Sequence, residues 1–317
     1  MSDPLQTAAN FRYSDSFFPY GFQVYLRSNN SDVLAAAKES WGAFRGRFES
    51  KPLELRVLVS RGGAACGKSA PLYRAQRNLL TAIADADNWA VCDLANGFGF
   101  LNLSGEVVED SEFFRFHFLE GAVYTLLNAC HILTIHAGCV AWKGTGVVLA
   151  GQSGAGKSSF AYACARRGWT YVADDASSIP FSLSTRTVLG NPRTVRFRPS
   201  ALKLFPELQG CVKLRNGKPT IEIKTEQFGN FESAEQCDVG RLIFLNRDAS
   251  ASRPALSAVS RGESRRRIYQ SPLPAELPIH RHRREALERL LQAECYELSY
   301  SHFDEAITLL ERTCEQG

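Results

Sequence analysis

A glycine-rich segment of eight residues, Gly151-Gln-Ser-Gly-Ala-Gly-Lys-Ser158, constrains the fold of this chain more than any other feature. It fits the pattern G-x-x-x-x-G-K-[ST], which carries structural meaning only between a buried strand and a helix. Both flanks are present. Val147–Ala150 is an apolar run of the kind buried in a parallel sheet, and residues 159–167 have the pattern of a helix that ends at Gly168. The segment therefore predicts a phosphate-binding loop.

In such a loop, backbone N–H groups and the helix N-terminus surround phosphate oxygens. The lysine reaches the β- and γ-phosphates, and the hydroxyl that follows it ligates Mg²⁺. We therefore expect ATP and Mg as cofactors, with Lys157 on the phosphates and Ser158 on the metal. The other residues expected to bind the nucleotide are Gly151, Ser153, Gly154, Ala155, Gly156 and Ser159.

The same pattern occurs a second time, from Gly62 to Ser69. Ala70-Pro71 follows at once, and the next thirty or so residues have the short alternation of strands rather than the pattern of a helix. We therefore interpret this match as a glycine-rich turn with an exposed Lys68.

Two adjacent carboxylates, Asp174 and Asp175, follow the helix stop at Gly168 and an apolar segment. A strand that ends there would bring them beside the phosphate loop, at the edge where open α/β sheets bind ligands. Adjacent side chains of an extended segment point in opposite directions. We expect Asp174 to support the metal and Asp175 to face the acceptor as a general base; a solvated turn is the alternative.

Three arginines, Arg193, Arg196 and Arg198, lie about twenty residues past the acidic pair. Guanidinium groups suit phosphate and carboxylate, so we expect Arg193 or Arg196 to stabilise the charge of the transferred group. A solvated strand edge explains them equally well. The basic clusters at 261–267 and 280–284 are interpreted as solvated loops or a docking surface for an acidic partner. Nucleic acid is not expected there, because the aromatic residues of a stacking platform are missing.

Composition limits the class of protein. With 44% apolar and 22% charged residues in 317, the chain is typical of globular proteins, and a net charge of +4 gives no general argument for nucleic-acid binding. The nine cysteines include no C-x-x-C pair, which argues against a zinc ribbon or a disulfide framework. No signal-peptide pattern or membrane span is visible. We expect a reduced, cytoplasmic protein.

The chain is expected to have an α/β fold in two regions: an α+β region at 1–110 of unknown role, and a catalytic domain at 111–317. Apolar spacing predicts helices at 32–50, 111–130 and 284–293. A last helix is expected from Ser301, where Ser301 and Asp304 have the spacing of a capping box. Residues 248–281 are predicted to be mostly loop.

The region from about Ile132 to Ile179 resembles the C-terminal P-loop kinase domain of the HPr kinase/phosphorylase family. The matching text is Ile135-His136-Ala-Gly, then residues 151–158, then Arg167-Gly-Trp-Thr-Tyr-Val-Ala-Asp174-Asp175. The resemblance implies catalytic roles for His136 and Lys157, Mg²⁺ binding by Ser158 and proton acceptance by Asp175. The family's Glu-Ile-Arg-Gly segment has no match, which weakens HPr as the substrate and phosphorolysis as a reaction.

The sequence thus predicts an ATP- and Mg-dependent kinase that transfers a phosphoryl group to a hydroxyl acceptor. The acceptor is a protein or peptide serine or a small hydroxylated molecule, and homo-oligomers remain open. One alternative is a nucleotide-binding regulator without phosphotransfer. A phosphoenolpyruvate-carboxykinase-like enzyme is less favoured, because its metal-ligand layout is missing.

Overall fold

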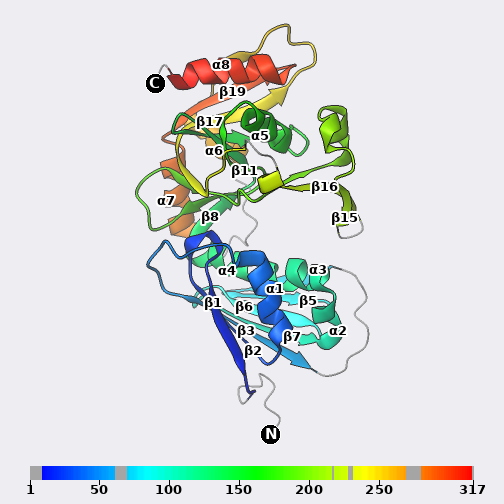
Figure 1. Ribbon diagram of the computed structural model, residues 1–317. Helices are drawn as coiled ribbons and strands as arrows, with labels where there is room; N and C mark the ends of the chain where they lie inside the picture. Colours follow the sequence, from blue (N-terminus) through cyan, green and yellow to red (C-terminus); the bar gives the residue numbers. More distant parts are fainter. Residues whose placement is uncertain (1–8, 61–69, 216–217, 228–230, 269–279, 316–317) are drawn as a thin grey trace. The chain divides into compact units, whose positions relative to one another are not determined.

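The chain forms two compact units in the computed structural model, which describes residues 9–60, 70–215, 218–227, 231–268 and 280–315. One unit comprises residues 1–131 with 273–280, and the other comprises residues 132–272 with 281–317 (Figure 1). This division falls further along the chain than the boundary expected at 110/111. Residues 111–130 belong to the first unit because their helices pack on its sheet.

The first unit is built on a seven-stranded mixed sheet with the order β1-β2-β3-β7-β6-β5-β4. β2, β3 and β7 run parallel, and the other neighbours are antiparallel. The strands are β1 (Tyr13–Phe17), β2 (Val24–Ser28), β3 (Leu53–Ser60), β4 (Leu72–Gln76), β5 (Leu79–Ile83), β6 (Trp89–Asp93) and β7 (Phe98–Ser104).

Helices pack on the face of this sheet that carries Leu55, Val57 and Leu101, all of them fully buried. The predicted helix at 111–130 forms in three continuous parts, with a π-helical turn in the middle. The helical elements are η1 (Pro19–Gly21), α1 (Ser31–Trp41), α2 (Gly105–Glu109), α3 (Ser111–Phe114), the π-helical turn η2 (Arg115–Leu119) and α4 (Glu120–Cys130).

The second unit is built on a nine-stranded sheet in which β17 links two parts. Its N-terminal half pairs with β13 and its C-terminal half lies between β10 and β19. The strands are β8 (Ile132–Ile135), β9 (Gly138–Trp142), β10 (Thr145–Ala150), β11 (Thr170–Ala173), β12 (Ser177–Pro180), β13 (Thr187–Leu189), β17 (Gln236–Arg247), β18 (Ala255–Ala258) and β19 (Glu294–Tyr300).

Helices cover both faces of this sheet. Alternate residues of β10 face opposite cores: Val147 and Leu149 pack in a cluster with two of the helices, and Val148 and Ala150 pack in a cluster with the other two. Period-two burial on both faces explains why β10 is an uninterrupted apolar run. On the first face lie α5 (Lys157–Arg166) and α8 (Phe303–Glu315), and on the second α6 (Arg261–Ile268) and α7 (His280–Leu290).

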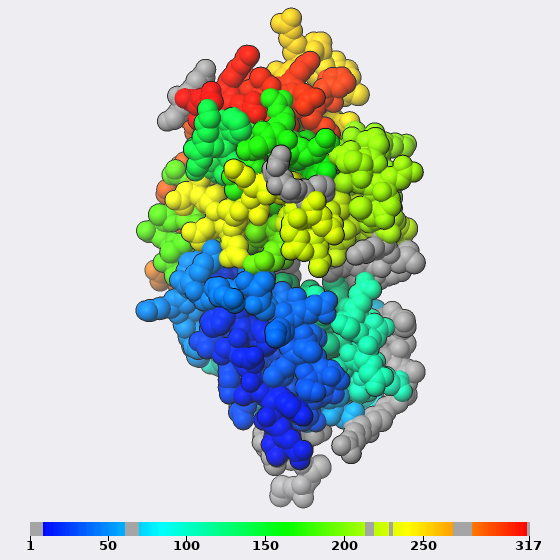
Figure 2. Space-filling model, viewed as in Figure 1, coloured from blue at the N-terminus to red at the C-terminus, as the bar shows by residue number. Residues whose placement is uncertain are grey.

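A separate three-stranded antiparallel sheet, in the order β14-β16-β15, lies to one side of the second unit (Figure 2). Its strands are β14 (Thr194–Phe197), β15 (Val212–Arg215) and β16 (Lys218–Lys224), with the short 3-10 turns η3 (Pro199–Lys203), η4 (Pro206–Leu208) and η5 (Thr225–Gln227) nearby in sequence. β14 packs against α5, so this small sheet lies beside the helix that follows the glycine-rich loop.

Several sequence expectations are corrected by the fold. The sheet around β10 is mixed rather than parallel, because a tight turn at Lys143-Gly144, where both φ angles are positive, returns the chain from β9 to β10. The first helix ends at Trp41 instead of continuing to residue 50, with Gly42 as its C-cap. The predicted loop at 248–281 contains α6, which begins where the Ser260 hydroxyl accepts a hydrogen bond from the Glu263 N–H.

The last helix begins at Phe303, and the Ser301 hydroxyl donates to the Ala251 carbonyl rather than serving in a capping box. The eight cysteines in the described residues are free thiols. None of the helices that the structure describes is long and apolar enough to cross a membrane.

Candidate functional site at the end of strands β9, β10 and β11

Three chain segments reach the same edge of the second unit's sheet. β9 is antiparallel to both β10 and β11, so β10 and β11 run in the same direction and end at the edge where β9 begins. His136 lies just before β9, the glycine-rich loop follows β10, and Asp174 and Asp175 follow β11. The sheet therefore brings together three groups that lie up to forty residues apart in the sequence.

The loop after β10 leads directly into α5, whose first residue is Lys157. Gly151, Gly154 and Gly156 all have positive φ, and a Cβ on Gly151 would stand 2.9 Å from the Ala155 Cβ. No side chain caps the N-terminus of α5. Its first N–H groups therefore remain available to an anion, as in a phosphate-binding loop.

The Lys157 side chain is buried and folds back on the loop, where its ammonium donates to the carbonyls of Gly151 (2.9 Å) and Gln152 (3.2 Å). Burial lowers the pKa of this lysine, while the negative charge of Asp175 acts in the opposite direction. The ammonium thus sits within electrostatic reach of Asp175. Carbonyl oxygens are weak partners for a buried cation, so a phosphate is a better ligand for this group.

Asp175 and His136 form a pair, with 2.9 Å between His136 Nδ1 and Asp175 Oδ1. Both side chains are substantially exposed, at 48% and 64%, so both remain accessible to a ligand. The Nδ1–H donates to the carboxylate, which fixes the ring and leaves the second carboxylate oxygen of Asp175 free to accept a proton. His136 therefore orients Asp175.

Asp174 and Asp175 lie in a bend that follows β11 and make different contacts. The Asp174 Oδ2 accepts a hydrogen bond of 2.8 Å from the Arg196 backbone N–H on β14. Burial raises the pKa of Asp174 to about 6, with a further contribution from the charge of Asp175. Asp174 thus joins β11 to the small sheet, and its carboxylate is also a hydrogen-bond partner of the Tyr171 hydroxyl.

The predicted arginines are found in ion pairs at the surface. Arg193 pairs with Glu235 and Arg196 pairs with Glu222, at 3.1 and 2.8 Å. Arg198 instead extends over the loop, where its Nη2 donates to the Ser153 hydroxyl at 2.8 Å. Its charge also lowers the pKa of Lys157.

Arg198 was thus the arginine that sequence reasoning overlooked as a site residue. Arg196 and Arg198 lie two apart on an extended segment and share a face, so sequence alone did not separate them. The signal that distinguishes them is the Pro199 that follows, which ends β14 and starts the η3 turn, so that Arg198 lies just beyond the strand.

Oxygen ligands suitable for Mg²⁺ are present beside the loop. The Ser158 hydroxyl makes no hydrogen bond to any residue that the structure describes, and Asp174 supplies a carboxylate at the same edge of the sheet. Mg²⁺ in phosphoryl-transfer sites is held by one or two carboxylates together with substrate phosphates rather than by a full protein cage. In the described part of the chain no cluster of three or more His, Cys, Asp or Glu residues forms a metal site.

The first glycine-rich match, residues 62–69, lies outside the described residues apart from its flanks. After it the chain forms the β4–β5 hairpin rather than a helix, so the strand–loop–helix context is missing.

No protein-family model matches this chain, and no curated protein matches it. Among solved structures it is similar to the HPr(Ser) kinase/phosphatase from Coxiella burnetii, with 16% identity and a TM-score of 0.30. The match covers 58% of this chain and 99% of that chain.

Proposed function

We propose that the chain is an ATP- and Mg²⁺-dependent kinase that transfers the γ-phosphoryl group of ATP to a hydroxyl acceptor. The observation that carries this proposal is the position of Asp175. Asp175 follows β11, is hydrogen-bonded to His136 and lies within electrostatic reach of the buried Lys157 ammonium. A carboxylate that faces a phosphate loop is the arrangement that phosphoryl transfer to an alcohol requires.

In this mechanism the N–H groups of residues 151–159 surround the β- and γ-phosphates, and Lys157 leaves its loop carbonyls to contact them. Ser158 and Asp174 are the residues that would hold Mg²⁺, which would neutralise charge on the phosphates. Asp175 accepts the proton of the acceptor hydroxyl, and His136 keeps its carboxylate in place.

Arg198 takes the role that the sequence assigned to Arg193 or Arg196. Because Arg198 already lies over the loop on Ser153, a small rotation of its side chain brings the guanidinium to the transferred phosphoryl group. Arg193 and Arg196 are committed to Glu235 and Glu222, so we assign them to the stability of the small sheet.

The acceptor is an alcohol on a flexible or small molecule. Asp175 is 64% exposed, so its carboxylate is open to solvent rather than enclosed in a tight cavity. A serine in an extended peptide or a small polyol fits such an open base better than a side chain on a rigid surface.

The test measures ADP release and phosphoryl transfer from labelled ATP with Mg²⁺, using serine-containing peptides and sugar acids as acceptors. Wild-type protein should transfer phosphate to one of these classes, and Asp175→Asn should lose about 10²–10⁴-fold in kcat while ATP binding is retained. Equal rates in both proteins would refute the assignment of the base. ATP binding without any turnover would favour a nucleotide-dependent regulator.

A further inference from the structure

The hairpin formed by β4 and β5 ends the sheet of the first unit. Among the described residues β4 pairs with β5 alone, and all five of its residues are exposed. Four of the eight exposed large apolar side chains in the described chain lie on this hairpin: Leu72 (59%), Tyr73 (51%), Leu79 (44%) and Ile83 (40%). An exposed apolar edge of this kind is a template for pairing with another strand.

Alternate backbone N–H and C=O groups of β4 point away from β5. The two-residue loop Arg77-Asn78 closes the hairpin at the pair Gln76 and Leu79. In an antiparallel hairpin the closing pair is hydrogen-bonded and bonded pairs alternate with unbonded ones. Tyr73 and Ala75 therefore direct their N–H and C=O groups away from β5, and no strand in the described residues pairs with them.

The hairpin also carries charge of one sign. Residues 72–83 contain Arg74 and Arg77 and no acidic residue. Arg74 makes no ion pair with any residue that the structure describes. The opposite edge of the sheet differs: β1 carries Asp15 between two serines, which is the polar edge that soluble sheets normally show.

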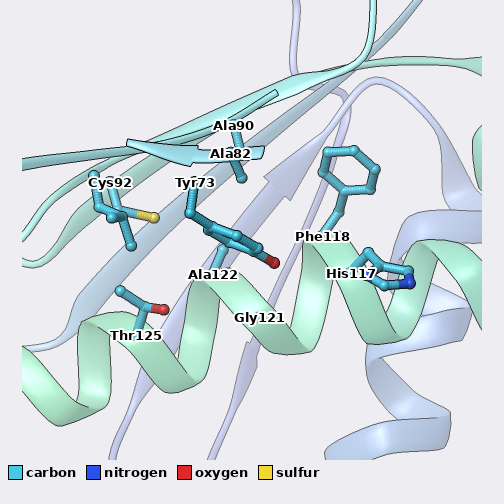
Figure 3. A pocket seen from close by; sticks show the side chains of 10 residues that line it. Tyr73, Ala82, Ala90, Cys92, His117, Phe118, Gly121, Ala122 and Thr125 are labelled. Carbon is cyan, nitrogen blue, oxygen red and sulfur yellow. The ribbon is translucent and has the colours of Figure 1, made fainter. Parts of the chain in front are cut away.

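A small cavity lies under this hairpin, between β4–β6 and the helical segment η2–α4 (Figure 3). Tyr73 extends from β4 toward the helix, and its hydroxyl lies 3.9 Å from the point that a Cβ on Gly121 would occupy. Tyr73 thus forms the outer wall of the cavity. A strand added outside β4 would pack alternate side chains against this ring, which is how strand-addition sites select sequence.

We propose that the β4 edge binds an extended acidic peptide, in which apolar and acidic residues alternate, by adding it as an eighth strand. Its backbone pairs with Tyr73 and Ala75, its apolar side chains pack against Tyr73, and a carboxylate pairs with Arg74. A second copy of this hairpin is a poorer occupant, because two hairpins that each carry two arginines repel each other. This inference does not depend on phosphotransfer by the second unit.

The experiment uses the full chain and a fluorescein-labelled decapeptide in which Val and Glu alternate, with binding followed by fluorescence anisotropy. Ala75→Pro removes one outward N–H, and proline is tolerated on an edge strand where the N–H faces solvent. Both Ala75→Pro and Arg74→Glu should weaken binding by about tenfold or more. Raising the salt concentration from about 50 mM to about 500 mM should weaken it as well, because the ion pair is exposed.

Three controls test whether the peptide binds specifically at the β4 edge. Tyr13→Ala removes another exposed tyrosine ring (42%) from the β1 edge and should leave binding unchanged. A peptide with Lys in place of Glu should not bind. Arg74→Gln, which keeps the length of the side chain without its charge, serves if Ala75→Pro shows an altered thermal unfolding curve, and it should weaken binding about threefold or more.

Unchanged affinity in Arg74→Glu and Arg74→Gln would overturn the proposal. So would self-association of the wild-type chain in sedimentation equilibrium that Arg74→Glu abolishes, since the edge would then be occupied by a second copy.

Discussion

The same eight-residue pattern occurs in both units of this chain, and its surroundings differ. After Gly151–Ser158 the chain enters α5, which presents an uncapped N-terminus. After residues 62–69 it enters the β4–β5 hairpin, which has no helix N-terminus to offer. Both segments contain a lysine and a hydroxyl at the same spacing. The comparison shows that an anion site depends on the element that follows the glycines, because the helix supplies the N–H groups.

The largest effect on phosphoryl transfer is expected when the lysine of the Gly151–Ser158 loop is substituted. Lys157→Ala removes the buried ammonium that faces Asp175, and it should lower phosphoryl transfer by about 10²–10³-fold, as the loss of one charge-stabilising group does. Lys68→Ala is the matched control, since it makes the same change in the second copy of the pattern, and it should leave transfer unchanged. Labelled ATP and the acceptor found for wild-type protein give both rates. Equal losses in the two variants would mean that sequence context does not distinguish the segments.

A smaller effect is expected for the arginine that lies over the loop. Arg198→Ala removes the guanidinium beside Ser153, so transfer should fall by about 10–10²-fold with little change in protein stability. Arg193→Ala breaks only a surface pair with Glu235, and transfer should stay within about twofold of wild type. The same assay at saturating ATP separates them. A larger loss in Arg193→Ala than in Arg198→Ala would return the role to the residue expected from the sequence.

The pKa of Asp174 leads to a prediction for how protein stability depends on pH. This prediction can be tested without an activity assay. Burial raises the pKa of Asp174 from 3.8 to about 6. Above pH 6 the buried carboxylate is ionised, which destabilises the folded state. Below about pH 4 the carboxylate is protonated and this destabilisation is absent. The stability connected with this group is therefore present at low pH and lost as the pH rises through 6. Asp174→Asn removes the cost and can still accept from the Arg196 N–H.

We expect Asp174→Asn to be more stable than wild type by about 1–3 kcal/mol at pH 8, with the difference disappearing as the pH falls toward 4. Urea unfolding at several pH values measures it. A variant that is less stable than wild type at pH 8 would contradict the raised pKa. Asp175→Asn, on the exposed neighbour, serves as the control for a change of charge alone.

The chemistry of the site was visible in the sequence where it depends on local patterns. The strand before Gly151 and the helix after it follow from nearest neighbours, and the structure has both: β10 ends at Ala150 and α5 begins at Lys157. Non-local pairing was not visible. The bond between the Arg196 N–H and Asp174 depends on β14 lying near the end of β11, and the Arg196–Glu222 ion pair depends on the pairing of β14 with β16. The Arg193–Glu235 pair likewise joins residues far apart in the sequence, and no local pattern encodes these contacts.

The smallest effect is expected for substitutions at the N-termini of α6 and α8. Ser260 and Ser301 each precede an acidic residue by three positions, yet only the Ser260 hydroxyl accepts from the backbone, at the Glu263 N–H, while the Ser301 hydroxyl donates to Ala251. Ser260→Ala should therefore expose the first amides of α6 to faster hydrogen exchange, equivalent to about 1 kcal/mol. Ser301→Ala should leave exchange in the first turn of α8 unchanged, because its hydroxyl does not accept from that turn. If the two substitutions changed hydrogen exchange in their helices equally, the three-residue spacing from serine to an acidic residue would be enough to make an N-cap.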